Sequence, residues 1–229
     1  MNIKDITIYE DENIIVLDKP SGLLVVPDRF DSAKKNFYSI LKDSYKKIFI
    51  VHRLDKDTSG IVLFAKNSFI HRDLSMLWEK GRVYKTYYAL VHSKPEKQQG
   101  VINKPVAELK KKKGVMCIDF KNGKKSITEY KVLKRFNRFS FLEIHPKTGR
   151  THQIRVHLAS IGCPVAGDVL YNRPEATNLK EKLKDNMPRL CLHAGGIRFF
   201  YEPAKKELEL KSPIPDDMRE ILKNVKCIM

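Results

Sequence analysis

The nine residues from His52 to Gly60 read HRLDKDTSG and gather the side chains of this chain that are best suited to chemistry. They place an imidazole, a guanidinium and two carboxylates directly before a Thr-Ser-Gly turn. Three kinds of site could use such a set: the catalytic loop of a protein kinase, a metal site, or a single carboxylate presented on a loop. Each makes a different demand on the surrounding residues.

A kinase catalytic loop would need the order H-R-D-L, and here Leu54 and Asp55 are exchanged. The later stretch IDFKNG is not the D-F-G of a kinase, and no glycine-rich phosphate loop precedes the motif. The sequence therefore argues against a kinase.

A metal site could draw on a scattered set of imidazoles and carboxylates, namely His52, Asp55, Asp57, His145, His152 and His157. His152 and His157 lie five positions apart, whereas two ligands on one helix face need four, and no H-E-x-x-H arrangement occurs. A two-metal nucleic-acid hydrolase would need acidic companions that Asp55 and Asp57 lack. We expect no metal ion, and we interpret the histidines as structural.

The third interpretation makes Asp55 a single catalytic carboxylate, with Arg53 beside it and residues 57–60 shaping the turn. A carboxylate that must stay ionised in a cleft needs a cation, and an arginine supplies one without losing its own charge. The alternative is an aspartate that caps a turn, beside an arginine in a surface ion pair. These nine residues alone leave both interpretations open.

The charge of the chain indicates an anionic partner. Lys and Arg number 44 against 27 Asp and Glu, which gives a net charge of +17. Basic runs such as LKKKKG and KVLKRFNR, with Phe136, Phe139 and Phe141 among them, favour nucleic acid. A membrane surface would call for a long basic amphipathic helix, and none is seen in the sequence. The alternative is a lysine-rich surface that is merely solvated.

Length and cysteine usage indicate one large domain, or two closely packed subdomains, in a reducing compartment. A chain of 229 residues can bury a substantial core. Its four cysteines stand far apart without a C-x-x-C pair, so we expect buried, reduced thiols. The acidic start MNIKDITIYEDEN does not resemble a signal peptide, and no apolar run is long enough to cross a bilayer. We therefore expect a cytoplasmic location.

Hydrophobic periodicity predicts the elements that carry these residues. Strands are expected at 49–56, 60–67, 84–92 and 206–213, within 6–28 and 190–203, and repeatedly from 100 to 146. Helices are expected near 37–48, 68–81, 151–162 and 216–225. Ser68 and Thr151 are expected to cap two of these helices, and KNGK to turn a hairpin. This predicts an α+β fold with a mixed, largely antiparallel sheet and flanking helices, folded as two subdomains around a central cleft.

Five blocks of the sequence together resemble the RluA-type branch of the pseudouridine synthases. HRLDKDTSG matches its H-R-L-D-x-x-T-S-G signature, and the other blocks, in the family's order, are EDENIIVLDKPSGLLVVP, KTYYALV, TGRTHQIRVHLASIGCPVAGDVLY and LCLHA. The branch with a G-R-L-D signature fits less well. The resemblance covers residues 9–203, and it implies that residues 1–229 form a single catalytic domain without the separate N-terminal S4 module that many such enzymes carry.

The resemblance implies that uridine in RNA is converted to its C-glycoside isomer without any cofactor. Asp55 would be the essential carboxylate, acting as nucleophile at C1′ or as base at C2′. Arg155 would pair with it and keep it ionised. Tyr87 would stack on the target uracil and assist proton removal from C5, with Tyr88 as its rival on the opposite face of the strand.

The resemblance also implies how the target base is held. Leu192 would lie beneath the uracil, and Arg53 would fill the space left when the uridine is turned out of the RNA stack. Arg53 could instead pair with Asp57 or contact a phosphate. Phosphate contacts are expected from exposed basic residues, among them Lys111, Lys112, Lys124 and Arg150.

We expect the partner to be a structured stem-loop of ribosomal RNA or tRNA, and the protein to be a monomer that does not bind membranes. The alternative from another class is an RNA-binding protein or RNA chaperone without catalysis. Such a protein would have no need for an ionised Asp55 facing an anionic polymer.

Overall fold

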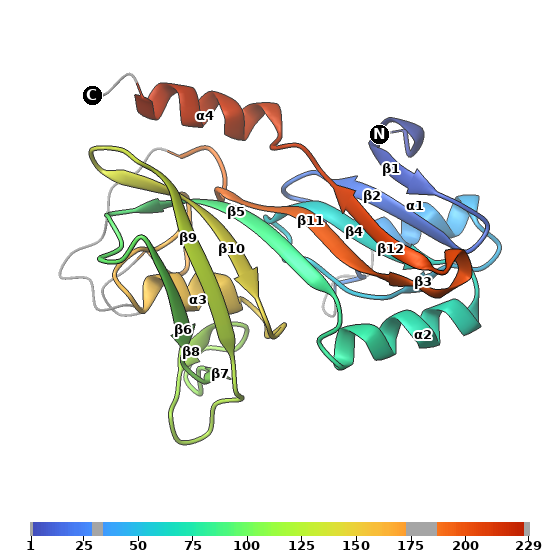
Figure 1. Ribbon diagram of the computed structural model, residues 1–229, viewed down its shortest axis with the longest axis horizontal. Coiled ribbons are helices and arrows are strands. Elements are labelled where there is room, and N and C mark those ends of the chain that lie inside the picture. Colours follow the sequence, from blue (N-terminus) through green and yellow to red (C-terminus); the bar gives the residue numbers. More distant parts are fainter. Residues whose placement is uncertain (1, 29–33, 173–186, 227–229) are drawn as a thin grey trace. The chain divides into compact units, whose positions relative to one another are not determined.

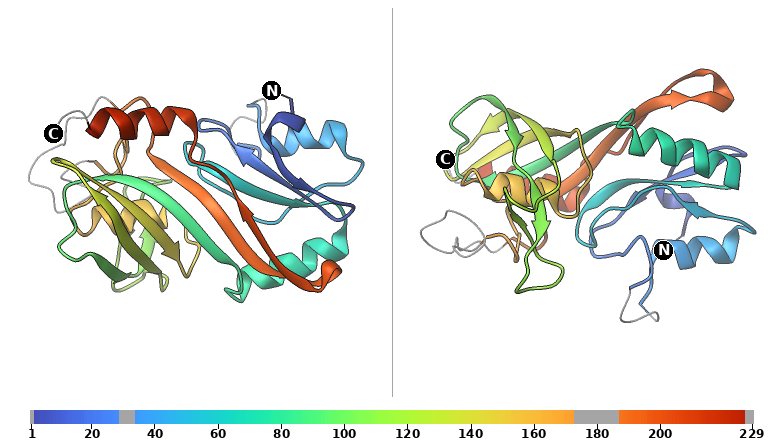
Figure 2. Two further views of the ribbon diagram at one scale, coloured as in Figure 1. Left: turned by 45° about the horizontal axis from the view of Figure 1, so that its top comes forward. Right: turned by 90° about the horizontal axis from the view of Figure 1, so that it is seen from below.

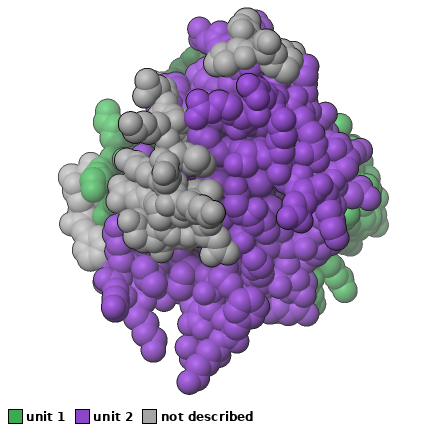
Figure 3. Space-filling model, turned by 90° about the vertical axis from the view of Figure 1, so that its left-hand side faces the viewer, with its two compact units in different colours: residues 1–85, 194–213 green, residues 86–193, 214–229 purple. Residues whose placement is uncertain are grey.

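The computed structural model describes residues 2–28, 34–172 and 187–226. The chain forms two compact units (Figure 3). The first comprises residues 1–85 and 194–213, and the second comprises residues 86–193 and 214–229. Each unit has its own hydrophobic core, in agreement with the predicted division into two subdomains.

The first unit is built on antiparallel strands. Its sheet order is β1-β2-β4-β11, from Thr7–Glu10, Ile14–Lys19, Ser59–Ala65 and Leu192–Tyr201. The short β3 (Phe49–Ile50) pairs with β4, and β12 (Lys206–Lys211) pairs with β11 (Figure 1). Every residue of β4 is buried, as its apolar run predicts. The predicted strand 49–56 is wrong beyond Ile50, because residues 51–58 form a loop.

Helices α1 (Phe37–Ser44) and α2 (Ser68–Glu79) belong to the first unit, with the short 3-10 helices η1 (Lys4–Ile6) and η3 (Glu202–Ala204). Leu74 of α2 is buried, and Leu77 and Trp78 pack beside it, as helical spacing predicts. The predicted cap is wrong by one residue: Asn67, not Ser68, accepts the backbone N–H of Ile70 at 3.0 Å. An extended residue just before the helix can aim its side chain at these N–H groups, whereas Ser68 is already helical.

The second unit carries the antiparallel order β5-β10-β9-β6, from Tyr84–His92, Phe139–Pro146, Ile127–Arg135 and Gln99–Asn103. A second, two-stranded sheet consists of β7 (Val106–Glu108) and β8 (Met116–Ile118). Figures 1 and 2 show this β7–β8 hairpin projecting from the larger sheet of its unit. The antiparallel pairing in both units confirms the predicted largely antiparallel α+β fold.

Helices α3 (Gln153–Ala159) and α4 (Asp216–Lys226) complete the second unit. Ile154 and Leu158 of α3, four residues apart on one face of the helix, lie in its core. The prediction that Thr151 caps α3 is wrong, because His152 holds the position before the first turn, with a left-handed backbone and no capping side-chain bond. The prediction of buried cysteines is confirmed for Cys163 and Cys191, whereas Cys117 is partly exposed and Cys227 lies outside the described residues.

Candidate active site

The loop that carries Asp55 joins β3 to β4 in the first unit. The backbone N–H of Thr58 donates to the carbonyl of Asp55 at 3.2 Å, which closes a turn over residues 55–58. Asp55 is partly buried, whereas Arg53, Lys56 and Asp57 are exposed. The loop therefore presents one half-buried carboxylate among solvated charges.

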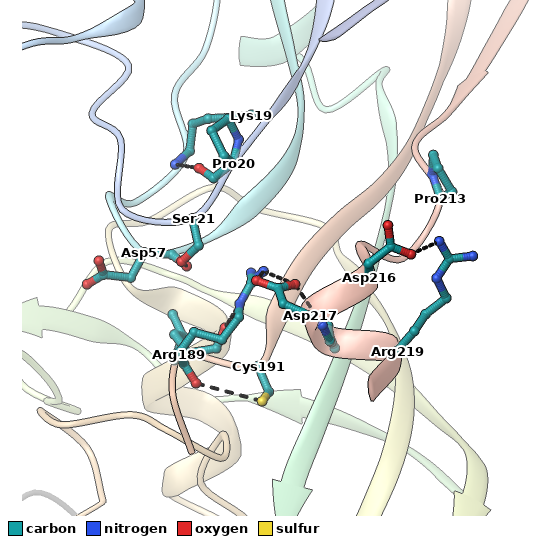
Figure 4. A network of polar contacts seen from close by, with 12 residues as sticks. Lys19, Pro20, Ser21, Asp57, Arg189, Cys191, Pro213, Asp216, Asp217 and Arg219 are labelled. Atoms are coloured by element: carbon teal, nitrogen blue, oxygen red, sulfur yellow. Dashed lines mark hydrogen bonds and ion pairs between the residues drawn. The ribbon is translucent and has the colours of Figure 1, made fainter. Parts of the chain in front are cut away.

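A buried lysine holds the part of this loop that follows Asp55. Lys19 lies at the end of β2, its side chain is fully buried, and its ammonium donates to three backbone carbonyls. These belong to Pro20 at 2.9 Å (Figure 4), Leu23 at 2.6 Å and Lys56 at 2.7 Å. Three acceptors match the three N–H groups of an ammonium, which satisfies a charged group removed from water.

The turn after Lys19 adds two further bonds to the same loop. The N–H of Gly22 donates to the carbonyl of Lys56 at 3.0 Å, and the Ser21 hydroxyl donates to the carbonyl of Asp57 at 2.7 Å. The segment Lys19–Gly22 therefore fixes the carbonyls of the two residues that follow Asp55. These bonds hold the backbone of the loop in place next to the aspartate.

Gly60, the last residue of the HRLDKDTSG motif, is required by close backbone approach. Its φ is +111°, and a Cβ atom there would lie 2.2 Å from the carbonyl oxygen of Ala194 in β11. Thr58 and Ser59 before it are buried. The Thr-Ser-Gly part of the motif therefore packs the start of β4 tightly against β11 and anchors the loop at its second end.

His52 is structural, as predicted. Its Nε2 accepts the backbone N–H of Leu63 in β4 at 3.1 Å, and its ring stacks on Trp78 with centroids 4.7 Å apart. Burial, together with the nearby charge of Lys85, lowers the pKa of His52 to about 3. The ring is therefore neutral at physiological pH, which its acceptor role requires.

In the second unit, Arg155 of α3 is buried against Asp168. Its Nε donates to Asp168 Oδ2 at 2.7 Å and its Nη2 to Oδ1 at 2.8 Å. Oδ1 also accepts the backbone N–H groups of Leu170 and Tyr171 at 3.0 and 3.1 Å. The guanidinium carbon lies 5.0 Å from the centre of the Tyr171 ring. This geometry fixes the plane and the direction of the guanidinium.

The other polar residues of α3 attach the helix to β9. Gln153 Nε2 donates to Thr128 Oγ1 at 3.0 Å, and His157 Nδ1 lies 2.8 Å from the same oxygen. His157 Nε2 lies 2.8 Å from the carbonyl of Lys104, so the ring bridges two fixed groups, and burial lowers its pKa. Gln153 and His157 are four residues apart and share one helix face. They are anchors of the helix that carries Arg155.

The tyrosines of β5 alternate across the strand. Tyr87 pairs in register with Ile144 of β10 and packs against the core of the second unit. Tyr88 pairs with Glu143 and stacks on Phe141, with ring centroids 5.9 Å apart. The two rings therefore leave opposite faces of the sheet, as the alternation of a strand dictates.

The remaining predicted site residues are placed as follows. Leu192 is buried in the core of the second unit. Lys111, Lys112, Lys124 and Arg150 are exposed, in keeping with contacts to a large anion. Among the residues described, no group of three His, Cys, Asp or Glu side chains could hold a metal ion.

Two residues of the site were missed by the sequence reasoning. Asp168 and Lys19 both stand inside the quoted blocks, in AGDVLY and LDKPSG, but were given no role. The prediction that Arg155 pairs with Asp55 stays a prediction. Within its own unit, the carboxylate on Arg155 is that of Asp168. Asp55 and Arg53 belong to the first unit, and Tyr87, Arg155 and Leu192 belong to the second.

Comparison with known proteins decides the family. The model of the RNA pseudouridylate synthase family matches residues 13–160, which include the Asp55 loop and α3. The chain belongs to this family. The dual-specificity RNA pseudouridine synthase RluA of Vibrio cholerae is 38% identical over 81% of this chain and 76% of its own length. The ribosomal large subunit pseudouridine synthase D of Buchnera aphidicola is 36% identical over 94% of this chain and 72% of its own length.

This RluA-type pseudouridine synthase is thus an isomerase that acts on RNA. Its fold is that of the human RNA pseudouridylate synthase domain containing 4, with a TM-score of 0.80 at 24% identity, over 97% of this chain and 94% of that one. None of the helices within the described ranges has the length and apolar character needed to cross a membrane.

Proposed function

We propose that this pseudouridine synthase modifies specific uridines in stem-loops of ribosomal RNA or tRNA in the cytoplasm, as a single catalytic domain, and that Asp55 is its catalytic carboxylate. The observation that carries the proposal is the construction of the Asp55 loop. His52 fixes the loop before Asp55, and Lys19 and Gly60 fix it after Asp55, while Asp55 itself is left partly exposed. A carboxylate held in this way is preorganised without being sequestered from a substrate.

The choice of substrate is supported by the relatives. One relative is named a ribosomal large subunit pseudouridine synthase, and another a dual-specificity RNA pseudouridine synthase. The net charge of +17 suits a phosphate backbone. A uridine in a stacked helix cannot reach Asp55, so the enzyme turns it out of the stack at a cost of a few kcal/mol, and a loop base lowers that cost.

Arg155 is assigned to keep Asp55 ionised. Asp168 accepts hydrogen bonds from Nε and Nη2 of the guanidinium, so Nη1 is the nitrogen that would donate to a second carboxylate. In this assignment Asp168 fixes the guanidinium, and the guanidinium in turn aims Asp55. Two carboxylates on one arginine are compatible, since its five N–H groups point outward in a planar fork.

The isomerisation conserves the atoms of the nucleotide. The N1–C1′ bond breaks, the uracil turns, C5 bonds to C1′, and the proton lost from C5 is balanced by one gained at N1. Asp55 acts as nucleophile at C1′ or as base at C2′. Tyr87 stacks on the uracil and assists removal of the C5 proton, Leu192 supports the base from below, and Arg53 fills the space that it leaves.

The substrate can be found by mapping pseudouridines in total RNA. RNA from cells with and without the gene is treated with carbodiimide and sequenced, and purified enzyme is then added back to the RNA that lacks the modification. We expect a small set of sites in ribosomal RNA or tRNA to be lost without the gene and restored by the enzyme. If no site in ribosomal RNA or tRNA changes in either step, the proposed substrate is refuted.

A further inference from the structure

The connection between β8 and β9 exposes a large aromatic ring. Phe120 is 77% exposed, although burying a phenylalanine side chain would stabilise the fold by about 1.5–3 kcal/mol. A single exposed apolar residue needs no explanation by itself. Phe120 differs from such a residue because its turn is held by hydrogen bonds and exposed lysines follow it in the chain.

The turn that carries Phe120 is rigidly built. Asp119 Oδ1 accepts the backbone N–H groups of Lys121 and Asn122 at 2.9 and 3.0 Å, and the N–H of Gly123 donates to the Asp119 carbonyl at 2.9 Å. A Cβ on Gly123 would lie 2.3 Å from that carbonyl oxygen. The exposure of the Phe120 ring therefore comes from a tightly bonded turn and not from a loose loop.

The predicted KNGK hairpin is corrected here. Val106 of β7 pairs with Ile118 of β8 and also forms a bridge with Lys124. The turn thus joins β8 to the segment at Lys124, and these two lie on opposite sides of β7. In a hairpin they would pair with each other, whereas here both pair with β7. The N–H of Asp119 also donates to the carbonyl of Pro105 at 3.0 Å, which ties the base of the turn to the start of β7. This arrangement places the Phe120 turn beside the β7–β8 hairpin.

Exposed lysines lie on two loops, one at each end of the β7–β8 pair. Lys121, Lys124 and Lys125 are exposed in the Phe120 turn and just after it, and residues 110–113 form an exposed lysine run at the tip of the β7–β8 hairpin. The two loops close the two ends of the β7–β8 pair, in which Glu108 pairs with Met116 and Val106 with Ile118. The turn that carries the ring and the loop at the tip of the hairpin are therefore both rich in positive charge.

We propose that Phe120 is a stacking platform for an unpaired base of the substrate RNA, with the lysines of residues 110–113 and 121–125 on the phosphates to either side. A rigid aromatic ring offers a face on which any base can stack, and cations placed around it follow the backbone. Only an unpaired base exposes its face, so this surface selects single-stranded loops over duplex. The inference rests on the proposed action on RNA stem-loops and adds a contact outside the catalytic residues.

Phe69 provides a matched control. It is 81% exposed in the first turn of α2, and the charged residues nearest to it along that helix, Arg72 and Asp73, have opposite signs. Phe69 therefore tests whether loss of an exposed ring alone weakens RNA binding. Phe120→Trp keeps a stacking ring, and Phe120→Ala removes it.

Binding is measured by anisotropy with a fluorescein-labelled single-stranded RNA of about 12 nucleotides and with a duplex of the same length, at several salt concentrations. We expect Phe120→Ala to weaken single-strand binding by about fivefold or more, in line with base–aromatic stacking. Duplex binding should change by less than about twofold, and the slope of affinity against salt should stay the same, because no phosphate contact is lost. Phe120→Trp and Phe69→Ala should bind like the wild type.

The inference is overturned if Phe120→Ala binds the single strand within about twofold of the wild type, or if it loses duplex affinity equally. An unchanged melting temperature of Phe120→Ala shows that the fold is intact. Pseudouridine formation by the wild-type enzyme on total RNA is scored separately. Formation of pseudouridine with unchanged Phe120→Ala binding refutes the platform alone, whereas a selective loss of binding without any pseudouridine refutes the proposed function and leaves the platform standing.

Discussion

Arg155 and Asp168 form a two-pronged ion pair inside the second unit, with N–O distances of 2.7 and 2.8 Å and both side chains almost fully buried. Such a pair gives little net stability compared with apolar residues, but breaking it leaves a buried charge without compensation. The main effect of the pair is therefore to fix the plane and the direction of the Arg155 guanidinium.

Asp168→Asn is expected to lower the free energy of unfolding by about 3–5 kcal/mol, because the Arg155 charge loses its carboxylate. Urea unfolding measures the change. Asp217→Asn is the matched control: Asp217 receives two bonds from Arg189, at 2.8 and 2.9 Å (Figure 4), but its side chain is 54% exposed. That change should cost less than about 1 kcal/mol. Equal losses in the two variants would contradict the role of burial.

Lys19→Met should destabilise the first unit and the Asp55 loop together. Methionine keeps the length of the buried side chain but leaves the carbonyls of Pro20 and Leu23 without their donor, whereas the carbonyl of Lys56 keeps the N–H of Gly22. Each carbonyl left unsatisfied in the interior costs about 1–3 kcal/mol, so these two predict a loss of about 2 kcal/mol or more in unfolding free energy. Lys56→Met, in which an exposed lysine is replaced in the same loop, should leave stability unchanged in the same urea titration.

Gly60→Ala should be far more damaging than a comparable change at Gly22. Both glycines have positive φ, +111° and +87°, but only at Gly60 would the new Cβ meet backbone, whereas nothing lies within 4 Å of a Cβ at Gly22. Gly22→Ala should cost about 1–2 kcal/mol from its backbone conformation alone. Gly60→Ala should exceed this and yield little folded protein, as judged by the melting temperature. Similar costs at the two positions would show that β4 and β11 can separate.

His52 should make the protein less stable in acid. Its pKa is near 6.5 in the unfolded chain and about 3 in the folded protein, so the unfolded state binds the proton first as the pH falls. Its contribution is complete above pH 6.5 and is lost progressively toward pH 3, by about 1 kcal/mol per pH unit. Unfolding free energies of wild type and His52→Gln, measured from pH 7 to pH 5, should converge. A constant difference would show that His52 keeps its ordinary pKa.

Much of the fold can be predicted from local pattern. Leu74, Leu77 and Trp78 recur at helical spacing and do pack inward, and the apolar run from Ser59 to Ala65 is a buried strand. The capping residue of α2 is harder to predict, because Asn67 and Ser68 are neighbours and both residue types suit the N-cap position. Only the backbone conformation decides between them.

The supports of the site could not be predicted, since they depend on contacts far along the chain. Lys19 reaches the carbonyl of Lys56, 37 residues away, and in the sequence it looks like any other lysine of a basic protein. Asp168 stands in a Gly-Asp turn, where an aspartate usually serves its own backbone, and it does so here while also binding Arg155. Burial gives both residues their importance, and burial is a property of the packed structure.

The role of Asp55 is tested most directly by comparing Asp55→Asn with Asp57→Asn in pseudouridine formation on RNA from cells lacking the gene. Both replace one carboxylate by an amide in the same loop, and Asp57 is the exposed one. Each variant is first shown to bind RNA and to melt like the wild type. Asp55→Asn should form no pseudouridine, and Asp57→Asn should keep most of the wild-type rate. Turnover by Asp55→Asn at a rate close to that of the wild type would contradict the account.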